Sequence, residues 1–500
     1  MTMARNTAPS FVLTRRLITT ESDAAYIDKK MRIVERLYNT GGKHCLKLLE
    51  EVKADYWYQH SLMMYKAAKD TDAQKVWAGE IFLVAAAYGL TEYDIHAYLG
   101  KGKVNAYTNG IGINIVQKAG TALYSGVKKA LFGKKLHYRK YNSTESFEDK
   151  KANTGIIYHP QKGTVSVMGR EIRLKQCRES DRYMQEALLH KIKYCRIVRR
   201  PFGQSYRYFV QFVMEGSSPE KIRPGNGTLG VDPGVSTMTA YSGKALHFVE
   251  LSKNVDKHTK RILHLQRVYD HRMRVNNPDC YNEDGTFKKG SRIHRTKGML
   301  RTMMKLKAAF RKRSTYVRQS NGYETNRLIE AGTALIVEPM TYRNLARRSK
   351  TIERQDKVST VTDRQGNTKQ VRKYKRRRRF GQSILIHSPA AFVEQLKTKA
   401  LKYGGTYEIV NTGSFRASQY DHATDKYEKH ELSERYKTVG GHVVQRDCYS
   451  SFLIYHKKDP DHVDRVQCEK DFSNFLKCQD ALLELGITNS NFGLTKSLAA

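Results

Sequence analysis

Long apolar runs are rare in this 500-residue sequence. The longest extends from Ile81 to Leu90 and contains ten residues, which is about half of what a membrane-spanning helix needs. The basic N-terminus, with Arg5, Arg15 and Arg16, is not followed by the apolar stretch that is typical of a secretory signal peptide. We therefore expect neither a membrane-spanning segment nor a membrane partner.

Paired cysteines are also missing. The sequence has seven cysteines, an odd number, and no two of them have the CxxC spacing. A disulfide framework and a cysteine-based zinc site both use paired cysteines. The pattern indicates reduced structural thiols, as in a cytoplasmic protein.

Acidic residues are scarce relative to basic ones. There are 49 Asp and Glu against 89 Lys and Arg, so the formal net charge is +40. A cationic field of this size has few stable partners besides polyphosphates and anionic membranes. Because no membrane segment is expected, the charge favours a nucleic acid partner.

The first half of the chain combines strand and helix patterns. The hydrophobic share of 39% and the aromatic share of 10% are sufficient for a folded protein, and the length favours about three modules. Strand patterns are expected at residues 9–20, 154–158, 164–168, 193–198 and 206–213. Helical periodicity runs from Ser22 to a stop at Gly41-Gly42 and then through residues 43–68, 72–89 and 110–132. We predict a small antiparallel β-barrel domain (residues 1–21 and 135–225) into which a helical domain (residues 22–134) is inserted.

The second half has a different pattern, in which strands alternate with long helices. Strands are predicted at residues 228–232, 235–241, 334–338 and 406–410, and helices at residues 257–275, 291–330, 390–403 and 469–486. The stretch between Arg343 and the helix at 390 is expected to be irregular and basic. We predict one domain over residues 226–455 with a basic helical insertion (residues 254–330), followed by a C-terminal helical tail (residues 456–500).

Three acids follow apolar segments in this second domain. Asp232 ends a strand before Pro233-Gly234, Glu338 ends the apolar run from Ala334, and Asp447 follows Val443-Val444. A buried acid at a strand end is costly unless it is paired or binds a cation. Acids that converge at one sheet end can hold two metal ions for phosphodiester hydrolysis. Each acid alone could equally cap a helix or pair with an arginine.

The residues around these acids resemble a known family. Gly230-Val-Asp232-Pro-Gly234 resembles the first RuvC motif of TnpB proteins and of the compact type V CRISPR effectors derived from them. Ile336-Val-Glu338-Pro is similar to the second motif, and Gln445-Arg446-Asp447 is similar to the third. The acids are 106 and 109 residues apart, and their order suits that family. In the first half, only the architecture is similar to the family's helical recognition domain and barrel-like wedge domain.

The resemblance implies a multi-domain α+β protein with an RNase H-like (RuvC) α/β nuclease domain. It implies a DNA endonuclease that holds a guide RNA, pairs it with target double-stranded DNA beside a short flanking motif, and cleaves the DNA. Asp232 would bind both of two Mg²⁺ ions, and Glu338 and Asp447 would each complete one. Such a protein would work in the prokaryotic cytoplasm, associated with the nucleoid when it is bound to DNA.

Two other functions stay open. One is a nuclease-silent, RNA-guided DNA-binding regulator, although such a protein has no need to keep all three acids. The other is a protein-guided transposase or resolvase of the RNase H fold, although a resolvase domain would be far shorter. The sequence does not fix the oligomeric state, the guide RNA or the flanking motif.

The chain departs from the family between the second and third motifs. Family members usually carry a cysteine-based zinc ribbon there, whereas residues 411–442 contain no cysteine. His422, His430 and His442 stand on polar segments where solvated histidines are more common than zinc ligands. We predict that no zinc is bound. Packing of apolar side chains and salt bridges could order this loop instead. The apolar residues are Phe415, Tyr420, Tyr427, Leu432 and Tyr436, and the charged residues are Asp421, Asp425, Lys426, Glu434 and Arg435.

Two basic segments extend from the strands that carry the acids. Residues 257–318 have 18 Lys and Arg against 4 acids, and residues 343–379 have 15 against 3. Such runs are often only solvated surfaces, but here they adjoin the expected site. The candidate nucleic-acid contacts are Arg311, Lys312, Arg313, Arg376, Arg377, Arg378, Arg379 and Arg446.

Overall fold

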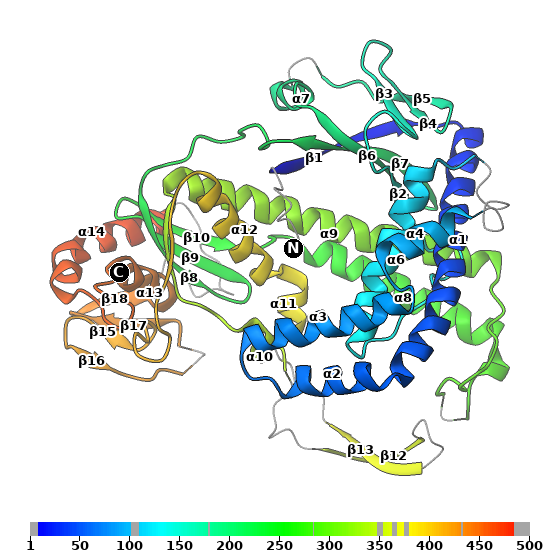
Figure 1. The fold of residues 1–500 in the computed structure, drawn as a ribbon. Coiled ribbons are helices and arrows are strands. Elements are labelled where there is room, and N and C mark those ends of the chain that lie inside the picture. The colour runs from blue at the N-terminus through cyan, green and yellow to red at the C-terminus, as the bar shows by residue number, and fades with distance from the viewer. Residues whose placement is uncertain are drawn as a thin grey trace. The chain divides into compact units, whose positions relative to one another are not determined.

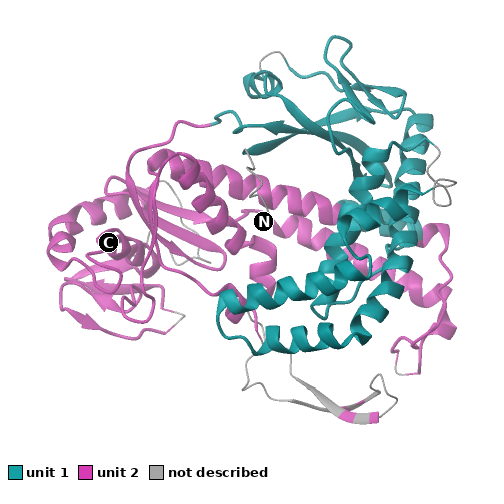
Figure 2. Ribbon diagram, in the orientation of Figure 1, with its two compact units in different colours: residues 1–221, 300–308 teal, residues 222–299, 309–500 magenta. Residues whose placement is uncertain are grey.

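The computed structural model describes residues 9–101, 110–178, 181–283, 285–347, 354–362, 368–374, 380–431 and 434–484 (Figure 1). The chain divides into two compact units, which Figure 2 shows in different colours. Unit 1 comprises residues 1–221 and 300–308, and unit 2 comprises residues 222–299 and 309–500. Both domains predicted for the first half fall in unit 1 except for residues 222–225, which belong to unit 2, and their boundaries stay a prediction. No helix among the described residues is long and apolar enough to cross a bilayer.

Among the described residues the sheet of unit 1 does not close, so the predicted small β-barrel is observed as an open antiparallel sheet. Its seven strands are antiparallel and lie in the order β2-β6-β7-β1-β5-β4-β3. Among the described residues, no pairing joins β2 to β3. These edge strands have three and four residues, which is short for the continuous ladder that closure requires. The strands are β1 (Ser10–Ile18), β2 (Ser146–Glu148), β3 (Ile156–His159), β4 (Thr164–Val167), β5 (Arg170–Leu174), β6 (Ile192–Phe202) and β7 (Ser205–Glu215).

The helices of unit 1 include one that continues where the sequence predicted a stop. The helices are α1 (Glu21–Ala54), α2 (Tyr56–Ala67), α3 (Thr71–Ala87), α4 (Glu92–Gly100), α6 (Ile113–Leu131) and α7 (Arg182–Leu188). Gly41 and Gly42 are buried inside α1. A Cβ added to Gly41 would lie 2.7 Å from Cδ2 of Leu123 in α6. These glycines therefore allow α6 to pack closely against α1, and they do not end the helix.

The first break in the helical region comes at Asp55. Its side chain accepts a hydrogen bond from the backbone N–H of Tyr58 at 3.0 Å and caps α2. The predicted single helix over residues 43–68 is therefore the end of α1 followed by α2. Helix α4 was not predicted, although Thr91 and Asp94 form a capping box at its start.

Unit 2 is built on a five-stranded mixed sheet in the order β10-β9-β8-β11-β14. Strands β8 (Thr228–Pro233), β9 (Thr237–Tyr241) and β10 (Leu246–Glu250) form an antiparallel meander. Strands β11 (Ala334–Val337) and β14 (Tyr407–Ile409) run parallel to β8. Of these five strands, β10 was not predicted.

Helices cover both faces of this sheet. The helices after the meander are α8 (Asp256–Asn276), the 3₁₀ turn η1 (Pro278–Cys280), α9 (Lys297–Ala331), α10 (Tyr342–Leu345), α11 (Gly381–His387), α12 (Pro389–Lys402), α13 (Arg446–Tyr455) and α14 (Arg465–Glu484), of which α9, α12, α13 and α14 contribute to the cores on the sheet. The core on one face contains residues of α12 and the last turns of α9, and the core on the other face contains residues of α13 and α14. The long basic helices and the tail helix predicted from the sequence are confirmed.

Unit 2 also has three small hairpins. They pair β12 (Arg354–Thr362) with β13 (Thr368–Tyr374), β15 (Tyr420–Asp421) with β16 (Lys426–Tyr427), and β17 (Tyr436–Val439) with β18 (His442–Gln445). The first hairpin lies in the basic stretch that was predicted to be irregular. That prediction is wrong because residues 354–374 carry the β-branched residues of a strand pair among their charges.

Candidate active site

Strand alternation places Asp232 and Glu338 on the same face of the sheet. In β8, Leu229 and Val231 pack on the α12 side, so Gly230 and Asp232 face α13. In β11, Leu335 and Val337 also pack on the α12 side, so Glu338 is directed toward the face that α13 covers. The two strands are parallel neighbours, and the backbone N–H of Glu338 donates to the carbonyl of Val231 at 3.3 Å. Both carboxylates therefore leave the same edge of the sheet.

The third acid comes from a helix. Residues 442–445 form β18, and α13 begins at Arg446, so Asp447 lies in the first turn of α13 and not at the end of a sheet strand. The Gln445 side chain caps this helix by accepting from the backbone N–H of Cys448 at 2.6 Å. The hydroxyl of Thr239 in β9 donates to the carbonyl oxygen of Asp447 at 2.7 Å. This bond fixes the first turn of α13 beside the strand that pairs with β8.

A glycine allows α13 to approach the sheet. A Cβ added to Gly230 would lie 2.3 Å from the backbone nitrogen of Tyr455 and 2.4 Å from the carbonyl oxygen of Ser451. No side chain fits at this position while α13 keeps its place. The glycine of the first motif therefore brings the helix that carries Asp447 against the strand that carries Asp232.

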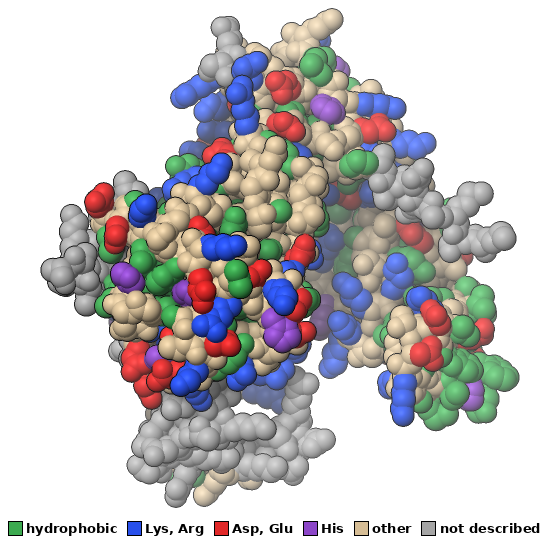
Figure 3. Space-filling view, turned by 90° about the vertical axis from the view of Figure 1, so that its left-hand side faces the viewer, with side chains coloured by type: hydrophobic (Ala, Val, Ile, Leu, Met, Phe, Trp, Pro, Cys, Tyr) green, Lys and Arg blue, Asp and Glu red, His purple; other side chains and the backbone are tan. Residues whose placement is uncertain are grey.

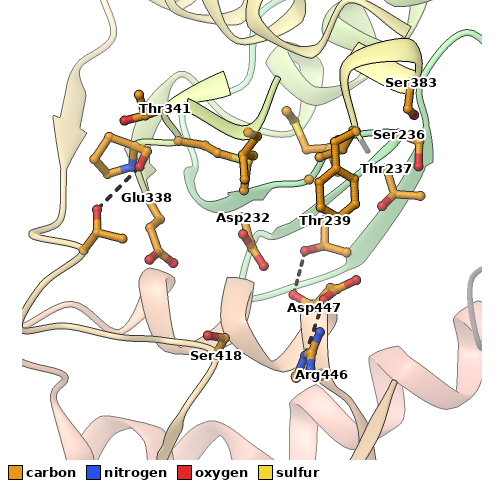
Figure 4. Close-up of a pocket in the computed structure, with 18 of the residues that line it drawn as sticks. Asp232, Ser236, Thr237, Thr239, Glu338, Thr341, Ser383, Ser418, Arg446 and Asp447 are labelled. Atoms are coloured by element: carbon orange, nitrogen blue, oxygen red, sulfur yellow. Dashed lines mark hydrogen bonds and ion pairs between the residues drawn. The ribbon is translucent and has the colours of Figure 1, made fainter. Parts of the chain in front are cut away.

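The three carboxylates line one pocket, as Figure 4 shows. Its cavity volume is about 740 Å³, and all its lining residues belong to unit 2. Asp232, Glu338 and Asp447 direct their oxygens into this space from β8, the end of β11 and α13 (Figure 4). The sequence motifs, more than 100 residues apart, thus meet at one site.

The carboxylates repel one another. Burial, together with the negative charges of Glu338 and Asp447, raises the pKa of Asp232 well above its usual range, while Arg446 partly opposes this shift. Burial raises the pKa of Glu338 to about 7. Acids held together in this way favour a proton or a cation between them. A proton or a bound cation would offset the repulsion in this pocket.

Two guanidinium groups flank Asp447 without a close hydrogen bond to it. Arg446 Nε is 3.9 Å from Asp447 Oδ1, and Arg435 Nη1 is 3.7 Å from Asp447 Oδ2. Arg446 is 8% exposed, and its Nη1 donates to the carbonyl of Glu431 at 2.9 Å. Its Nε is buried and has no hydrogen-bond partner among the described residues. Both cations offset the negative charge and leave the Asp447 oxygens accessible to another ligand.

The other predicted nucleic-acid contacts lie elsewhere. Arg311, Lys312 and Arg313 are consecutive in α9, where Lys312 is exposed and Arg313 lies 5.4 Å from the ring centroid of Phe310. Arg376, Arg377, Arg378 and Arg379 lie outside the described residues. Contact of any of these residues with nucleic acid stays a prediction. The same holds for Arg446, whose burial makes it first a neighbour of the carboxylates.

The loop at the zinc-ribbon position has a small core of its own. Phe415 and Tyr420, two of the predicted aromatic residues, are buried, whereas Tyr427 is 41% exposed and Leu432 lies outside the described residues. His422 is also buried, and its Nδ1 forms a 2.6 Å hydrogen bond with the hydroxyl of Tyr449 in α13. The prediction that this histidine is solvated is therefore wrong. A buried histidine needs a polar partner, and the third motif supplies one in Tyr449.

A buried lysine joins the same core. Lys437 Nζ donates to the carbonyl of Tyr420 at 2.7 Å and lies 4.3 Å from the ring centroid of Tyr449. Burial lowers the pKa of Lys437 to about 8. Ion pairs at the surface of the loop join His430 to Glu434 and Asp425 to Arg465 of α14. The loop is thus attached to α13 and α14 by aromatic, polar and ionic contacts.

Sequence reasoning missed two residues that shape the pocket, Thr239 and Arg435. Thr239 pairs directly with Asp232 across the β8–β9 hairpin. The Pro233-Gly234 turn fixes that register, so the sequence contained a usable signal for Thr239. Arg435 lies in a loop, where nothing in the local pattern indicates which way the side chain points.

No protein-family model matches the sequence, and no curated protein matches it. Among solved structures, the matches to this chain include a Cas12f1 complex with guide RNA and target DNA, at 10% identity, with a TM-score of 0.46 and coverage of 90% of this chain and 99% of that one. A second one is a CRISPR-Cas12f ternary complex, at 11% identity, with a TM-score of 0.24 and coverage of 87% and 82%. A third is a Cas12i complex with crRNA and double-stranded DNA, at 10% identity, with a TM-score of 0.26 and coverage of 91% and 64%.

Proposed function

We propose that this protein is an RNA-guided DNA endonuclease with a RuvC-like site. It would bind a guide RNA, pair it with target DNA beside a short flanking motif, and cleave the DNA by two-metal hydrolysis. The observation that carries the proposal is the meeting of Asp232, Glu338 and Asp447 in one pocket. Their motifs were identified from the sequence, and unrelated acids so far apart have no reason to share a pocket.

The topology of unit 2 supports an RNase H-like domain. An antiparallel meander, β10-β9-β8, continues into the parallel strands β11 and β14, with helices on both faces. The long helices α8 and α9 are inserted between β10 and β11. In mixed sheets of this kind, sites form where strands end, and Asp232 and Glu338 lie at such ends.

The donor set fits Mg²⁺. Hard oxygen ligands suit this ion, which keeps several waters and takes only one or two protein carboxylates together with phosphate oxygens. Within the described ranges, no three His, Cys, Asp or Glu side chains are arranged to hold one ion together. A two-ion site needs only two protein carboxylates for each ion, because Asp232 with Glu338 would hold one ion and Asp232 with Asp447 the other. When bound, Mg²⁺ activates water and neutralises the charge of the phosphate.

The chain's own residues supply the remaining functions of the site. Thr239 holds the turn that carries Asp447, and Arg446 offsets the repulsion that raises the pKa of Asp232. Arg435, whose side chain is 44% exposed, adds a positive charge at the pocket wall. Together these groups favour the approach of a phosphodiester to a site that is rich in carboxylates.

We further propose guide RNA and target double-stranded DNA as the partners, with no membrane partner. A net charge of +40 suits binding to two polyanions, and base pairing would supply the sequence specificity. The prokaryotic cytoplasm, with the nucleoid as the place of DNA binding, is the expected location.

Charge-removing isosteres test the site. Asp232→Asn, Glu338→Gln and Asp447→Asn should each lower the cleavage rate by about 10³-fold or more while DNA binding is retained, because the acids act as a unit. The matched control is Glu394→Gln, an exposed acid of α12 in the same unit, which should cleave at the wild-type rate. Near wild-type cleavage by any of the three variants would remove that residue from the site.

A further inference from the structure

Helices α2 and α3 in unit 1 expose an apolar surface that is not packed against other described residues. Hydrophobic side chains gather over these helices in the lower right-hand lobe of Figure 3. Five large apolar side chains are each more than half exposed there: Tyr56 at 70%, Trp57 at 64%, Met63 at 59%, Val76 at 62% and Leu83 at 65%. A contiguous apolar surface of this kind usually marks an interaction site.

The surface contains a groove between the two helices. The groove has a volume of about 440 Å³, and its lining includes Trp57, His60 and Trp77. The His60 ring lies 6.1 Å from the ring centroid of Trp57 and 5.7 Å from that of Trp77, both edge to face. Trp57 and Trp77 are the two tryptophans of the whole chain. Aromatic anchors of this kind dominate the binding energy of protein interfaces.

Two carboxylates line the same groove. Asp55 accepts hydrogen bonds from the Tyr58 backbone and the Tyr88 hydroxyl, and these bonds lower its pKa. Glu80 is exposed and has no ion-pair partner among the residues that the structure describes. The groove therefore combines aromatic rings with negative charge, which favours a cationic side chain.

The charge of this segment is opposite to that of the whole protein. Residues 50–94 contain eight acids, four lysines and no arginine, although the chain has a net charge of +40. Nucleic acid and anionic lipid are therefore poor occupants of this face. A second copy that docked through the same face would place these acids opposite one another, because a two-fold interface brings identical patches together.

We propose that the α2–α3 surface is a docking site for a basic amphipathic helix of a partner protein. The apolar side of that helix would cover Trp57, Val76 and Leu83, and its Lys or Arg side chains would lie beside Asp55 and Glu80. This is helix-in-groove recognition with complementary charge. The inference does not depend on nuclease activity.

Intrinsic tryptophan fluorescence tests this directly, because both tryptophans line the groove. The full chain, freed of nucleic acid by nuclease and high salt, is titrated with a short amphipathic helical peptide of Leu and Lys. A saturable change in emission is expected. The same peptide with Glu in place of Lys should bind at least about tenfold more weakly, because its charge repels the groove.

Exposed positions supply the variants. Leu83→Asp and Val76→Ser should each weaken peptide binding, the first by about tenfold or more, without changing the thermal unfolding of a chain in which both side chains face solvent. Glu80→Gln should weaken binding several-fold, and Glu186→Gln, an exposed acid of α7, should leave it unchanged.

Three results would overturn the proposal. One is the absence of a saturable fluorescence change, and another is equal binding of the Lys and Glu peptides. The third is a dimer of the purified chain that Leu83→Asp dissociates, because a second copy would then cover this surface.

Discussion

At the scale of single residues, the carboxylate cluster is unfavourable for the stability of the fold, because it buries negative charges close to one another. Asp232 and Glu338 are brought together by strand parity, and Asp447 is added by a helix whose first turn is fixed by Thr239. Burial raises the pKa of both strand carboxyls, and the negative charges of Glu338 and Asp447 raise that of Asp232 further. Such a cost is typical of a site kept for its chemistry.

These raised pKa values predict a pH dependence of stability. The pKa of Glu338 is about 7 in the folded protein and that of Asp232 is also raised, so the folded state retains protons that the unfolded chain releases above about pH 4–5. The stability that these groups contribute is fully present below that pH and is lost as the pH rises through about 7. The melting temperature without divalent cations should therefore fall between about pH 5 and about pH 8.

Asp232→Asn isolates this effect. With one charge removed, the fall in melting temperature should be smaller, and the variant should melt at a higher temperature than the wild type at about pH 8. Mg²⁺ should raise the melting temperature of the wild type and not that of the variant. Identical pH profiles for the two proteins would show that the carboxylates do not interact in this way.

Arg446 is expected to act through Asp232 and Asp447. Arg446→Met keeps the apolar stem, removes the charge that lowers the pKa of Asp232, and leaves the Glu431 carbonyl without its donor. The midpoint of the rise in cleavage rate with pH should therefore move to higher pH, and stability should fall by about 1–3 kcal/mol. Arg446→Lys keeps the positive charge and should partly restore both the pH midpoint of cleavage and the stability. If Arg446→Met lowers the stability but leaves the pH midpoint unchanged, Arg446 has only a structural role.

At the scale of elements, the glycines decide how closely helices approach. Gly230 faces the backbone of α13, where a Cβ would come within 2.3 Å of Tyr455 N. Gly230→Ala should destabilise the protein by about 3 kcal/mol or more and displace Asp447, because backbone atoms cannot rotate away. Gly322→Ala in α9 is the matched control. Nothing lies within 4 Å of its added Cβ, so thermal denaturation should show a gain of about 0.5–1 kcal/mol. Equal effects of the two substitutions would contradict the packing described for α13.

Helix patterns were predictable from the sequence where periodicity was long, as in α8 and α9, and four of the five strands of the unit 2 sheet were predicted as well. The failures have physical causes. Gly41-Gly42 reads as a stop because the same residues end helices and permit close helix packing, and only the tertiary partner α6 distinguishes the two. Closure of a sheet depends on whether its two edge strands pair with each other, and the local pattern of a short strand such as β3 does not show this. The three site acids could be identified because each is flanked by residues that resemble a family motif. The position of Asp447 on a helix could not be predicted, because the short strand β18 ends only one residue before that helix begins.

The loop at residues 411–442 should hold its structure without zinc. Its core joins Phe415, Tyr420 and Lys437 to Tyr449, and the His422 ring shares a hydrogen bond with that tyrosine. Chelation should leave the melting temperature unchanged, whereas Tyr449→Phe should lower stability by about 1–3 kcal/mol by leaving His422 without its partner. Elemental analysis of the dialysed protein is the deciding measurement. One zinc per chain, lost in His422→Ala or His442→Ala, would show that the histidines are metal ligands.

At the scale of the whole molecule, the charge of +40 makes an isolated chain unfavourable and a polyanion the natural partner. A discrete RNA should therefore copurify, and its binding should weaken with salt by about 0.7–0.9 log units per tenfold change for each phosphate neutralised. The α2–α3 segment carries an excess of acids over lysines, unlike the chain as a whole, and this charge suits the proposed contact with a basic partner protein.

Cleavage programmed by the copurified RNA is the most direct test of the central claim. The RNA is sequenced, and DNA carrying its complement beside randomised flanks is incubated with the purified complex and Mg²⁺. The wild type should cut only complementary DNA beside a subset of flanks, and the Asp232→Asn complex should bind the same DNA without cutting it. A protein that purifies without any enriched RNA, or an Asp232→Asn complex that cuts as fast as the wild type, would contradict the account.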